Sequence, residues 1–202
     1  MKPLLLIGGG GHCRSCIDVI EADGKYQIAG IINQPGGSSE PVLGYEVLGD
    51  DGDFTMLVKK YPNVLITVGQ IKNANLRVRL FTSLKKLGAK FPVIISPNAF
   101  VSPYSKINEG TIVMHGVIIG PGSKIGKNCI INNQSLIEHD SVVGSHCHIS
   151  TGAKLNGNVF VSTESFVGSG SVIHERVKIG EKCIISAGSV VYKNILTGTT
   201  FR

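Results

Sequence analysis

The sequence contains no tryptophan, and aromatic residues make up only 6% of its 202 positions. Charged residues are also few, at 17%, and the lysines and arginines behind the formal net charge of +6 are scattered along the chain. A nucleic-acid-binding surface usually shows a basic stripe interleaved with aromatic side chains, which this sequence lacks. We therefore expect no nucleic acid among its partners, although the positive charge favours an anionic one.

Long apolar runs and metal-binding cysteine patterns are also missing. No apolar stretch approaches the ~20 residues that span a bilayer, and the run 2–7 is too short for the core of a signal peptide. Cys129, Cys147 and Cys183 recur at a repeat position that needs a small buried side chain, which explains them without a metal. Cys13 and Cys16 fit one face of a helix, with a redox pair as the alternative. We expect a cytoplasmic protein with reduced thiols, no metal and no membrane contact.

A six-residue repeat organises the second half of the chain. Every sixth residue from Ile95 to Val191 is aliphatic, and the fifth position of every hexad is small or β-branched. Eleven of the seventeen fourth positions are Gly, Asn or Asp, the residue types that best tolerate a positive φ. Each hexad therefore predicts one short strand and one corner, and hexapeptide periodicity is typical of a parallel β-helix.

Before the hexads, apolar runs alternate with amphipathic segments. We expect strands at 4–7, 28–32, 64–68 and 93–95. Helices are expected after the first glycine-rich turn and at 53–60 and 76–87. Strands that alternate with helices predict a small parallel sheet covered by helices. The predicted organisation is an α/β Rossmann-like domain over residues 1–94, followed by a β-helix domain over residues 95–202.

The first predicted strand leads into a glycine-rich turn from Gly8 to Gly11, followed by His12. A turn of this kind presents backbone N–H groups to a phosphate, with the helix N-terminus behind them. The third glycine of the dinucleotide fingerprint is missing at Cys13, and Asn33 stands where an acidic ribose ligand is expected. The turn thus predicts a smaller phosphate-bearing ligand, or else a purely structural tight turn.

His139 has the most suggestive surroundings of the six histidines, because it occupies a corner between Glu138 and Asp140. A carboxylate bonded to one ring nitrogen fixes the tautomer and makes the other nitrogen a better base. If one coil contains three hexads, Gly157 lies beside His139 and has no side chain to cover it. The pattern predicts either a general base or a corner histidine held by a local salt bridge.

These features together resemble the NeuD/PglD-type sugar acetyltransferases. The resemblance lies in GGGGH at residues 8–12 and in N-x-x-S-x-I-E-H-D from Asn132 to Asp140, and it covers nearly the whole chain. It implies a left-handed parallel β-helix, a homotrimer with active sites between subunits, and acetyl-CoA as the co-substrate in the cleft between adjacent subunits. The family commonly continues into a GVPAK-like tail that helps to cover the cofactor, and this sequence stops at Arg202, where that tail would begin. We therefore expect either that the sequence is truncated or that this lid is absent.

The resemblance also implies roles for individual residues. His139 would be the general base, and Asp140 would raise its basicity. Glu138 completes the predicted catalytic set as the other carboxylate beside His139 in the sequence, without a role taken from the resemblance. The residues expected to line the acetyl-CoA site are His148, Gly157, Ser169 and Ala187. The residues expected to contact the nucleotide sugar are Gly10, Gly11, His12, Asn33, Gln34, Gly69 and Asn132. Among these, Asn33 and Gln34 replace the acidic pair usual in the family, and an amide can bond a ribose or uracil without adding charge.

We therefore expect an acetyl-CoA-dependent N-acetyltransferase that acts on the 4-amino group of a UDP-linked amino-sugar in bacterial surface-glycan synthesis. O-acetylation of a sialic-acid-like sugar is the main alternative. A second class is a zinc lyase of the β-helical carbonic anhydrase type, using His115, His139 and His146. A non-catalytic subunit that binds nucleotide sugars is a third.

Overall fold

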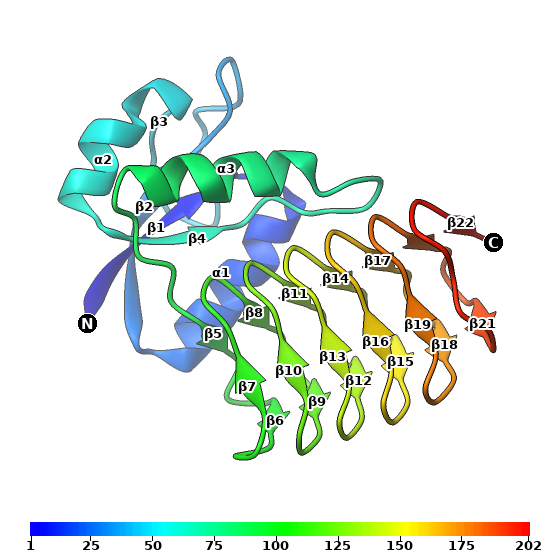
Figure 1. Cartoon of the computed structure of the whole chain (residues 1–202). Coiled ribbons are helices and arrows are strands. Elements are labelled where there is room, and N and C mark those ends of the chain that lie inside the picture. Colours follow the sequence, from blue (N-terminus) through cyan, green and yellow to red (C-terminus); the bar gives the residue numbers. More distant parts are fainter.

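Figure 1 shows the computed structural model of the protein, which describes all 202 residues. An α/β unit formed by the N-terminal part of the chain sits against one side of a coil of short strands. None of the helices combines the length and the apolar character required to cross a membrane.

The α/β unit is a small parallel sheet with helices on both faces. Its elements are β1 (Lys2–Ile7), α1 (Gly11–Asp23), β2 (Tyr26–Ile32), β3 (Val47–Gly49), the 3-10 helix η1 (Asp51–Asp53), α2 (Phe54–Lys60), β4 (Asn63–Ile66) and α3 (Asn75–Lys86). The strands lie in the order β3-β2-β1-β4, and all three pairings are parallel. The predicted strands and helices are present. The sequence missed β3 and η1, because elements of three residues form no recognisable apolar run or helical pattern.

The first strand shows why the chain folds this way, since its apolar run is buried on both faces of the sheet. Leu4 and Leu6 pack in the core that also includes α1 and the coil. Leu5 and Ile7 point the other way, into the core formed with α2 and α3. A continuous apolar run is the pattern expected of a central parallel strand covered on both sides.

The rest of the chain is a three-sided coil of two-residue strands. Its strands are β5 (Ile94–Ile95), β6 (Phe100–Val101), β7 (Lys106–Ile107), β8 (Ile112–Val113), β9 (Ile118–Ile119), β10 (Lys124–Ile125), β11 (Ile130–Ile131), β12 (Leu136–Ile137), β13 (Val142–Val143), β14 (His148–Ile149), β15 (Lys154–Leu155), β16 (Phe160–Val161), β17 (Phe166–Val167), β18 (Val172–Ile173), β19 (Lys178–Ile179), β20 (Ile184–Ile185), β21 (Val190–Val191) and β22 (Thr200–Phe201). They form three parallel sheets, one on each side of the coil.

We give each of the three sides of the coil a name, which is kept below. The covered face consists of β5, β8, β11, β14, β17, β20 and β22, the open face of β6, β9, β12, β15, β18 and β21, and the lysine face of β7, β10, β13, β16 and β19. Going along the chain, the first corner joins the covered face to the open face. The second corner joins the open face to the lysine face, and the third corner joins the lysine face back to the covered face.

The hexad rules hold through most of the coil. Each strand pairs with the strand eighteen residues further on, as Ile130 does with His148. Every fourth hexad position from Gly110 to Gly188 has a positive φ. The aliphatic first positions are fully buried through the middle of the coil, and so are small fifth positions such as Ser141. The predicted fold, a Rossmann-like α/β unit followed by a left-handed parallel β-helix, is confirmed.

The repeat slips once, in its last coil. Ile195 forms a bridge with Ile179, only sixteen residues away, and Thr200 pairs with Ile184 at the same spacing. The sequence frame had put Ile195 at a fifth position, and that assignment is wrong because the corner after Val191 is two residues shorter than the others. Ile195 instead takes the place of a first-position residue.

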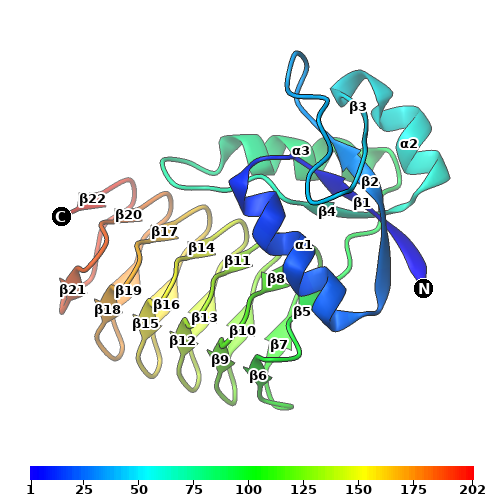
Figure 2. The ribbon, with the colours of Figure 1, turned by 180° about the vertical axis from the view of Figure 1, so that it is seen from behind.

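The α/β unit touches only one side of the coil. Figures 1 and 2 show α3 above the coil and α1 beside its first turns, while the loops that join β9 to β10 and β12 to β13 lie at its lower edge. His115 at the first corner pairs with Asp18 of α1, with 2.9 Å between Nε2 and Oδ2. Lys85 of α3 pairs with Glu109 at the third corner. The second corner is therefore the one turned away from the α/β unit.

Candidate active site

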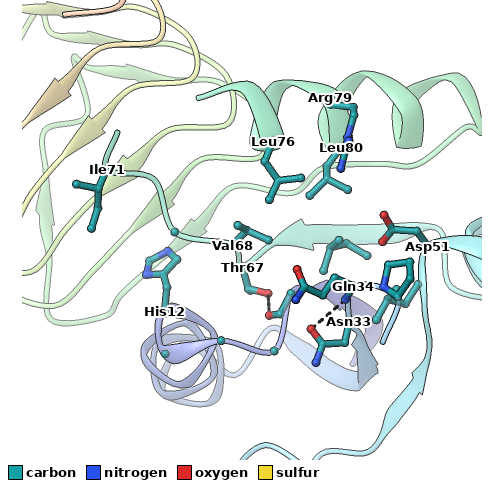
Figure 3. Close-up of a pocket in the computed structure, with 18 residues that line it drawn as sticks. His12, Asn33, Gln34, Asp51, Thr67, Val68, Ile71, Leu76, Arg79 and Leu80 are labelled. Atoms are coloured by element: carbon teal, nitrogen blue, oxygen red, sulfur yellow. Dashed lines mark hydrogen bonds between the residues drawn. The ribbon is translucent and has the colours of Figure 1, made fainter. Parts of the chain in front are cut away.

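A pocket of about 730 Å³ lies at the carboxyl ends of the parallel strands (Figure 3). Open α/β sheets bind ligands at this edge. The wall consists of the glycine-rich turn, the segments that follow β2 and β4, and one side of α3. The pocket residues that the sequence predicted are Gly10, Gly11, His12, Asn33, Gln34 and Gly69. Six of the seven predicted substrate residues therefore line one cavity, and Asn132 lies outside it.

The glycines of the turn have two different effects: Gly8 allows a close approach of the backbone, and Gly10 and Gly11 leave the end of α1 uncovered. Gly8 has a φ of 104°, and a Cβ there would lie 2.5 Å from Cγ2 of Val68, so β1 and the end of β4 could not approach as they do. Gly10 is the N-cap of α1 and supplies no side-chain oxygen to its first amides. Because no atom lies within 4 Å of a Cβ built on Gly10 or Gly11, the helix N-terminus is open to an anion.

Sequence reasoning missed several residues of this pocket. Thr67 lines it and donates a hydrogen bond from Oγ1 to the Gly8 carbonyl at 2.7 Å, which fixes the turn. The pocket is lined by two charged side chains, those of Asp51 in η1 and Arg79 in α3. The helical spacing of Leu76, Arg79 and Leu80 was a usable signal for one face of α3, whereas nothing around Asp51 pointed to the pocket.

His148 of the coil contacts the segment after β4 that borders the pocket, and it is only 7% exposed. Its Nδ1 donates to the Gln70 carbonyl at 2.6 Å, because a carbonyl oxygen can only accept. Nε2 then carries a lone pair, and the Asn132 amide lies 3.2 Å away as its donor. Burial lowers the pKa of His148 to about 4, partly opposed by the bond to Gln70, and burial together with the charge of Arg77 lowers the pKa of His12 to about 3. Both imidazoles are neutral at neutral pH.

Arg77 joins the pocket wall to the coil and is 1% exposed. Its Nη1 donates to the carbonyls of Ile66 at 2.9 Å and Val68 at 2.6 Å. Its Nη2 donates to Asn128 at the third corner, to the carbonyl at 3.0 Å and to Oδ1 at 2.7 Å. Burial lowers the pKa of Arg77 to about 10, so the side chain stays charged at neutral pH. Nothing in the sequence singled out this residue, because an arginine on an amphipathic helix usually faces water.

His139 lies at the second corner, where its Nδ1 is 2.9 Å from Oδ2 of Asp140. Its imidazole is 54% exposed. A Cβ on Gly157, one coil further, would lie 2.5 Å from His139 Nε2, so the expected neighbourhood of Gly157 and His139 is confirmed. The Glu138 carboxylate forms no ion pair with the imidazole, which leaves Asp140 as the partner of His139 within the chain.

Within one chain, the predicted groups fall into separate places. The pocket and His148 lie on the covered side of the coil, whereas His139 and Gly157 occupy the corner that the α/β unit does not touch. Ser169 and Ala187, expected in the acetyl-CoA site, belong to the first corner. One chain alone therefore does not bring the histidine–aspartate pair to the pocket.

The three histidines considered for zinc lie at three different corners. His115 is held by Asp18 and by Ser96 Oγ, 2.6 Å from Nδ1. His146 at the third corner packs edge-on against Phe81, and burial lowers its pKa to about 4. No group of three His, Cys, Asp or Glu side chains in the structure could hold a metal ion.

Comparison with known proteins gives matches over both parts of the chain. A family model described as the PglD N-terminal domain matches residues 3–84, and one described as the bacterial transferase hexapeptide (six repeats) matches residues 122–157. A search of curated proteins finds no match.

Solved structures match the chain over its whole length. One is perosamine N-acetyltransferase from Caulobacter crescentus, an asparagine-for-histidine mutant in complex with CoA and GDP-perosamine. It is 30% identical with a TM-score of 0.91, and the match covers 100% of this chain and 94% of that chain. The acetyltransferase domain of PglB from Neisseria gonorrhoeae FA1090 is 29% identical with a TM-score of 0.90, over 98% of this chain and 96% of that chain. WeeI from Acinetobacter baumannii AYE is 25% identical with a TM-score of 0.86, over 100% and 97%.

A glycine-turn pocket on a Rossmann-like unit, joined to a left-handed coil of hexads, defines an acyltransferase of the hexapeptide-repeat class. Within that class, the chain belongs to the NeuD/PglD-type sugar acetyltransferases. The family that the sequence resembled is thereby confirmed.

Proposed function

We propose that the protein transfers the acetyl group of acetyl-CoA to the amino group of a nucleotide-linked amino-sugar in surface-glycan synthesis. The observation that carries this proposal is the His139–Asp140 pair, with Gly157 leaving Nε2 uncovered. Relatives add support, because the perosamine enzyme is solved with CoA and GDP-perosamine and the PglB domain with acetyl coenzyme A. Acetyl-CoA is accordingly the proposed co-substrate.

The geometry of His139 suits a general base. Asp140 accepts the Nδ1 hydrogen, so the lone pair resides on Nε2, the nitrogen that faces Gly157. The sugar amine attacks the thioester carbonyl carbon while Nε2 takes up its proton. The new C–N bond forms, the C–S bond breaks, and the sulfur of coenzyme A leaves and is protonated. Glu138 has no contact that assigns it a part in these steps and stays a prediction.

The pocket suits the nucleotide-sugar substrate. Its diphosphate would lie over Gly10 and Gly11, where the open N-terminus of α1 stabilises negative charge. The sugar would then point towards His12 and the coil, with His148 and Asn132 beside it. Asn33, Gln34 and Gly69 complete the proposed contacts. His148, Gly157, Ser169 and Ala187 remain the proposed lining of the acetyl-CoA site.

A second copy of the chain would complete the site. The outward side chains of the open face are mostly apolar and uncovered: Phe100, Ile118, Leu136, Val172 and Val190. Burying such a surface against a neighbouring coil stabilises an oligomer. The homotrimer expected from the sequence would cover this face and bring the His139 corner of one subunit to the pocket of the next.

Substitution of the base tests the proposal. His139→Ala is expected to lower kcat at least ~100-fold, the scale of a lost general base, while the oligomer seen in sedimentation stays the same. The assay follows release of the coenzyme A thiol with UDP-linked amino-sugars, GDP-linked amino-sugars, CMP-linked sugars and free sialic acids in separate reactions. Near-normal turnover by His139→Ala would refute the proposal, and turnover confined to sialic acids would favour O-acetylation.

A further inference from the structure

The order of the strands sets the direction in which a nucleotide sugar lies in the pocket. The sheet order β3-β2-β1-β4 places the strand ends side by side along one edge. In this architecture the diphosphate lies at the turn after β1, and the ribose lies beside the residues after β2, here Asn33 and Gln34. A nucleotide bound in this way would place its base beyond β2, at the end of β3 and η1. Figure 3 shows Asp51 at this end of the pocket and His12 at the opposite one.

Asp51 is the acidic residue of η1 whose side chain takes no part in capping the helix. Asp50 accepts a hydrogen bond from the Gly52 amide at 2.8 Å, and Asp53 accepts one from the Asp50 amide at 3.0 Å, which together form a capping box. Asp51 makes no side-chain hydrogen bond and no ion pair, and its side chain lines the pocket. Helix capping therefore explains its two neighbours but not Asp51.

A second charged group faces the same end of the pocket from the other wall. Arg79 projects from α3 towards the space in front of Asp51 (Figure 3). Like Asp51, it has no ion-pair partner within the chain. A ligand group between these two side chains must offer hydrogen-bond donors to the carboxylate and acceptors to the guanidinium.

We propose that Asp51 and Arg79 select guanine, so that the substrate is a GDP-linked rather than a UDP-linked amino-sugar. Guanine presents two adjacent donors, N1–H and the N2 amino group, which fit the two oxygens of one carboxylate. It also presents O6 and N7, which an arginine binds in bidentate fashion. Uracil offers one donor between two carbonyl oxygens, and a carboxylate repels both. Adenine and cytosine offer the carboxylate one amino group only. This inference rests on the proposed function for the presence of a nucleotide.

The test measures nucleotide affinity without any acetyl transfer. Isothermal titration calorimetry with GDP, UDP, ADP and CDP is performed on the wild type, on Asp51→Asn and on a matched control, Asp23→Asn, whose carboxylate lies away from the pocket and pairs with Lys25. The wild type and the control are expected to bind GDP at least ~10-fold more tightly than UDP, the scale of one bidentate contact. Asp51→Asn should lose most of this preference, because its amide N–H faces a guanine donor.

Each outcome has a defined meaning. Equal or tighter binding of UDP by the wild type would overturn the assignment, as would an unchanged GDP-to-UDP ratio in Asp51→Asn. Turnover with a UDP-linked sugar and none with a GDP-linked one would also overturn it, while leaving the acetyltransferase proposal intact. Conversely, a strong preference for GDP without any release of coenzyme A would support Asp51 as the selector and refute the proposed function.

Discussion

At the scale of single residues, the candidate site depends on a side chain that is absent. Gly157 does not have a positive φ, so its backbone alone does not require glycine. What requires it is the 2.5 Å between a Cβ at this position and His139 Nε2. The same glycine therefore leaves the imidazole uncovered and fixes the room available to the amine that approaches it.

Gly157→Ala is expected to lower kcat about 10- to 100-fold with little change in stability. The added methyl group displaces the His139 ring, and misplacing a catalytic group by about 1 Å can cost that much. Steady-state kinetics with acetyl-CoA and a nucleotide-linked amino-sugar, together with thermal unfolding, measure both effects.

Glu175→Ala is the matched control, because it places an alanine at the same corner one coil further on. Its turnover should equal that of the wild type. Full activity of Gly157→Ala would show that His139 Nε2 does not need an uncovered approach.

At the scale of elements, α3 holds the pocket wall to the coil through one buried arginine. Arg77 donates to the two carbonyls that flank Thr67 and to the backbone carbonyl and Oδ1 of Asn128. Removing it would leave these acceptors buried without donors, which costs more than the hydrogen bonds themselves contribute. We therefore expect few substitutions of Arg77 to preserve the contact between the α/β unit and the coil.

Arg77→Met is expected to lower the free energy of unfolding by about 3 kcal/mol or more, because several buried acceptors lose their hydrogen-bond donor. Arg79→Met provides the control, since it makes the same replacement on the same helix at a side chain without an ion pair or hydrogen bond. That control should change stability by no more than about 0.5 kcal/mol. Equal urea midpoints and slopes for the two variants would contradict the role assigned to Arg77.

The sequence predicted the coil more completely than the pocket, and the reason is physical. One packing rule repeats in every hexad, so a single error hardly affects the pattern. The slip at Ile195 escaped detection because an isoleucine suits a first or a fifth position equally well. Gly10 and His12 were found because a glycine-rich turn between a buried strand and a helix is typical of a phosphate site. Asp51 could not be found, since its role depends on a short strand, β3, that the sequence does not reveal.

At the scale of the whole molecule, the pocket and the His139 corner lie on different sides of the coil. The α/β unit contacts the first and third corners through His115 and Glu109, and the second corner carries His139. For the proposed reaction, a complete site then needs groups from two chains. This arrangement makes the proposed activity a property of the assembly rather than of one subunit.

Mixing two inactive variants tests this directly. Gly10→Phe fills the phosphate end of the pocket, and His139→Ala removes the base. After mixed refolding in equal amounts, about a quarter of the sites in a trimer should combine an intact pocket with an intact neighbouring His139, so about a quarter of wild-type activity should return. Mixing His139→Ala with Gly157→Ala should restore none, because both changes affect the same corner. An absence of recovery in the first mixture would place the complete site within one chain.

The three-sided coil also limits how the length of this chain can change. Adding or removing one hexad between the α/β unit and His139 would turn every later residue by one side, so that His139 would arrive at the first or third corner. Adding or removing eighteen residues would keep the corner and shift His139 by one coil along the axis. Insertions within this segment are therefore tolerated by the fold in steps of six, but the angular placement of His139 is kept only in steps of eighteen.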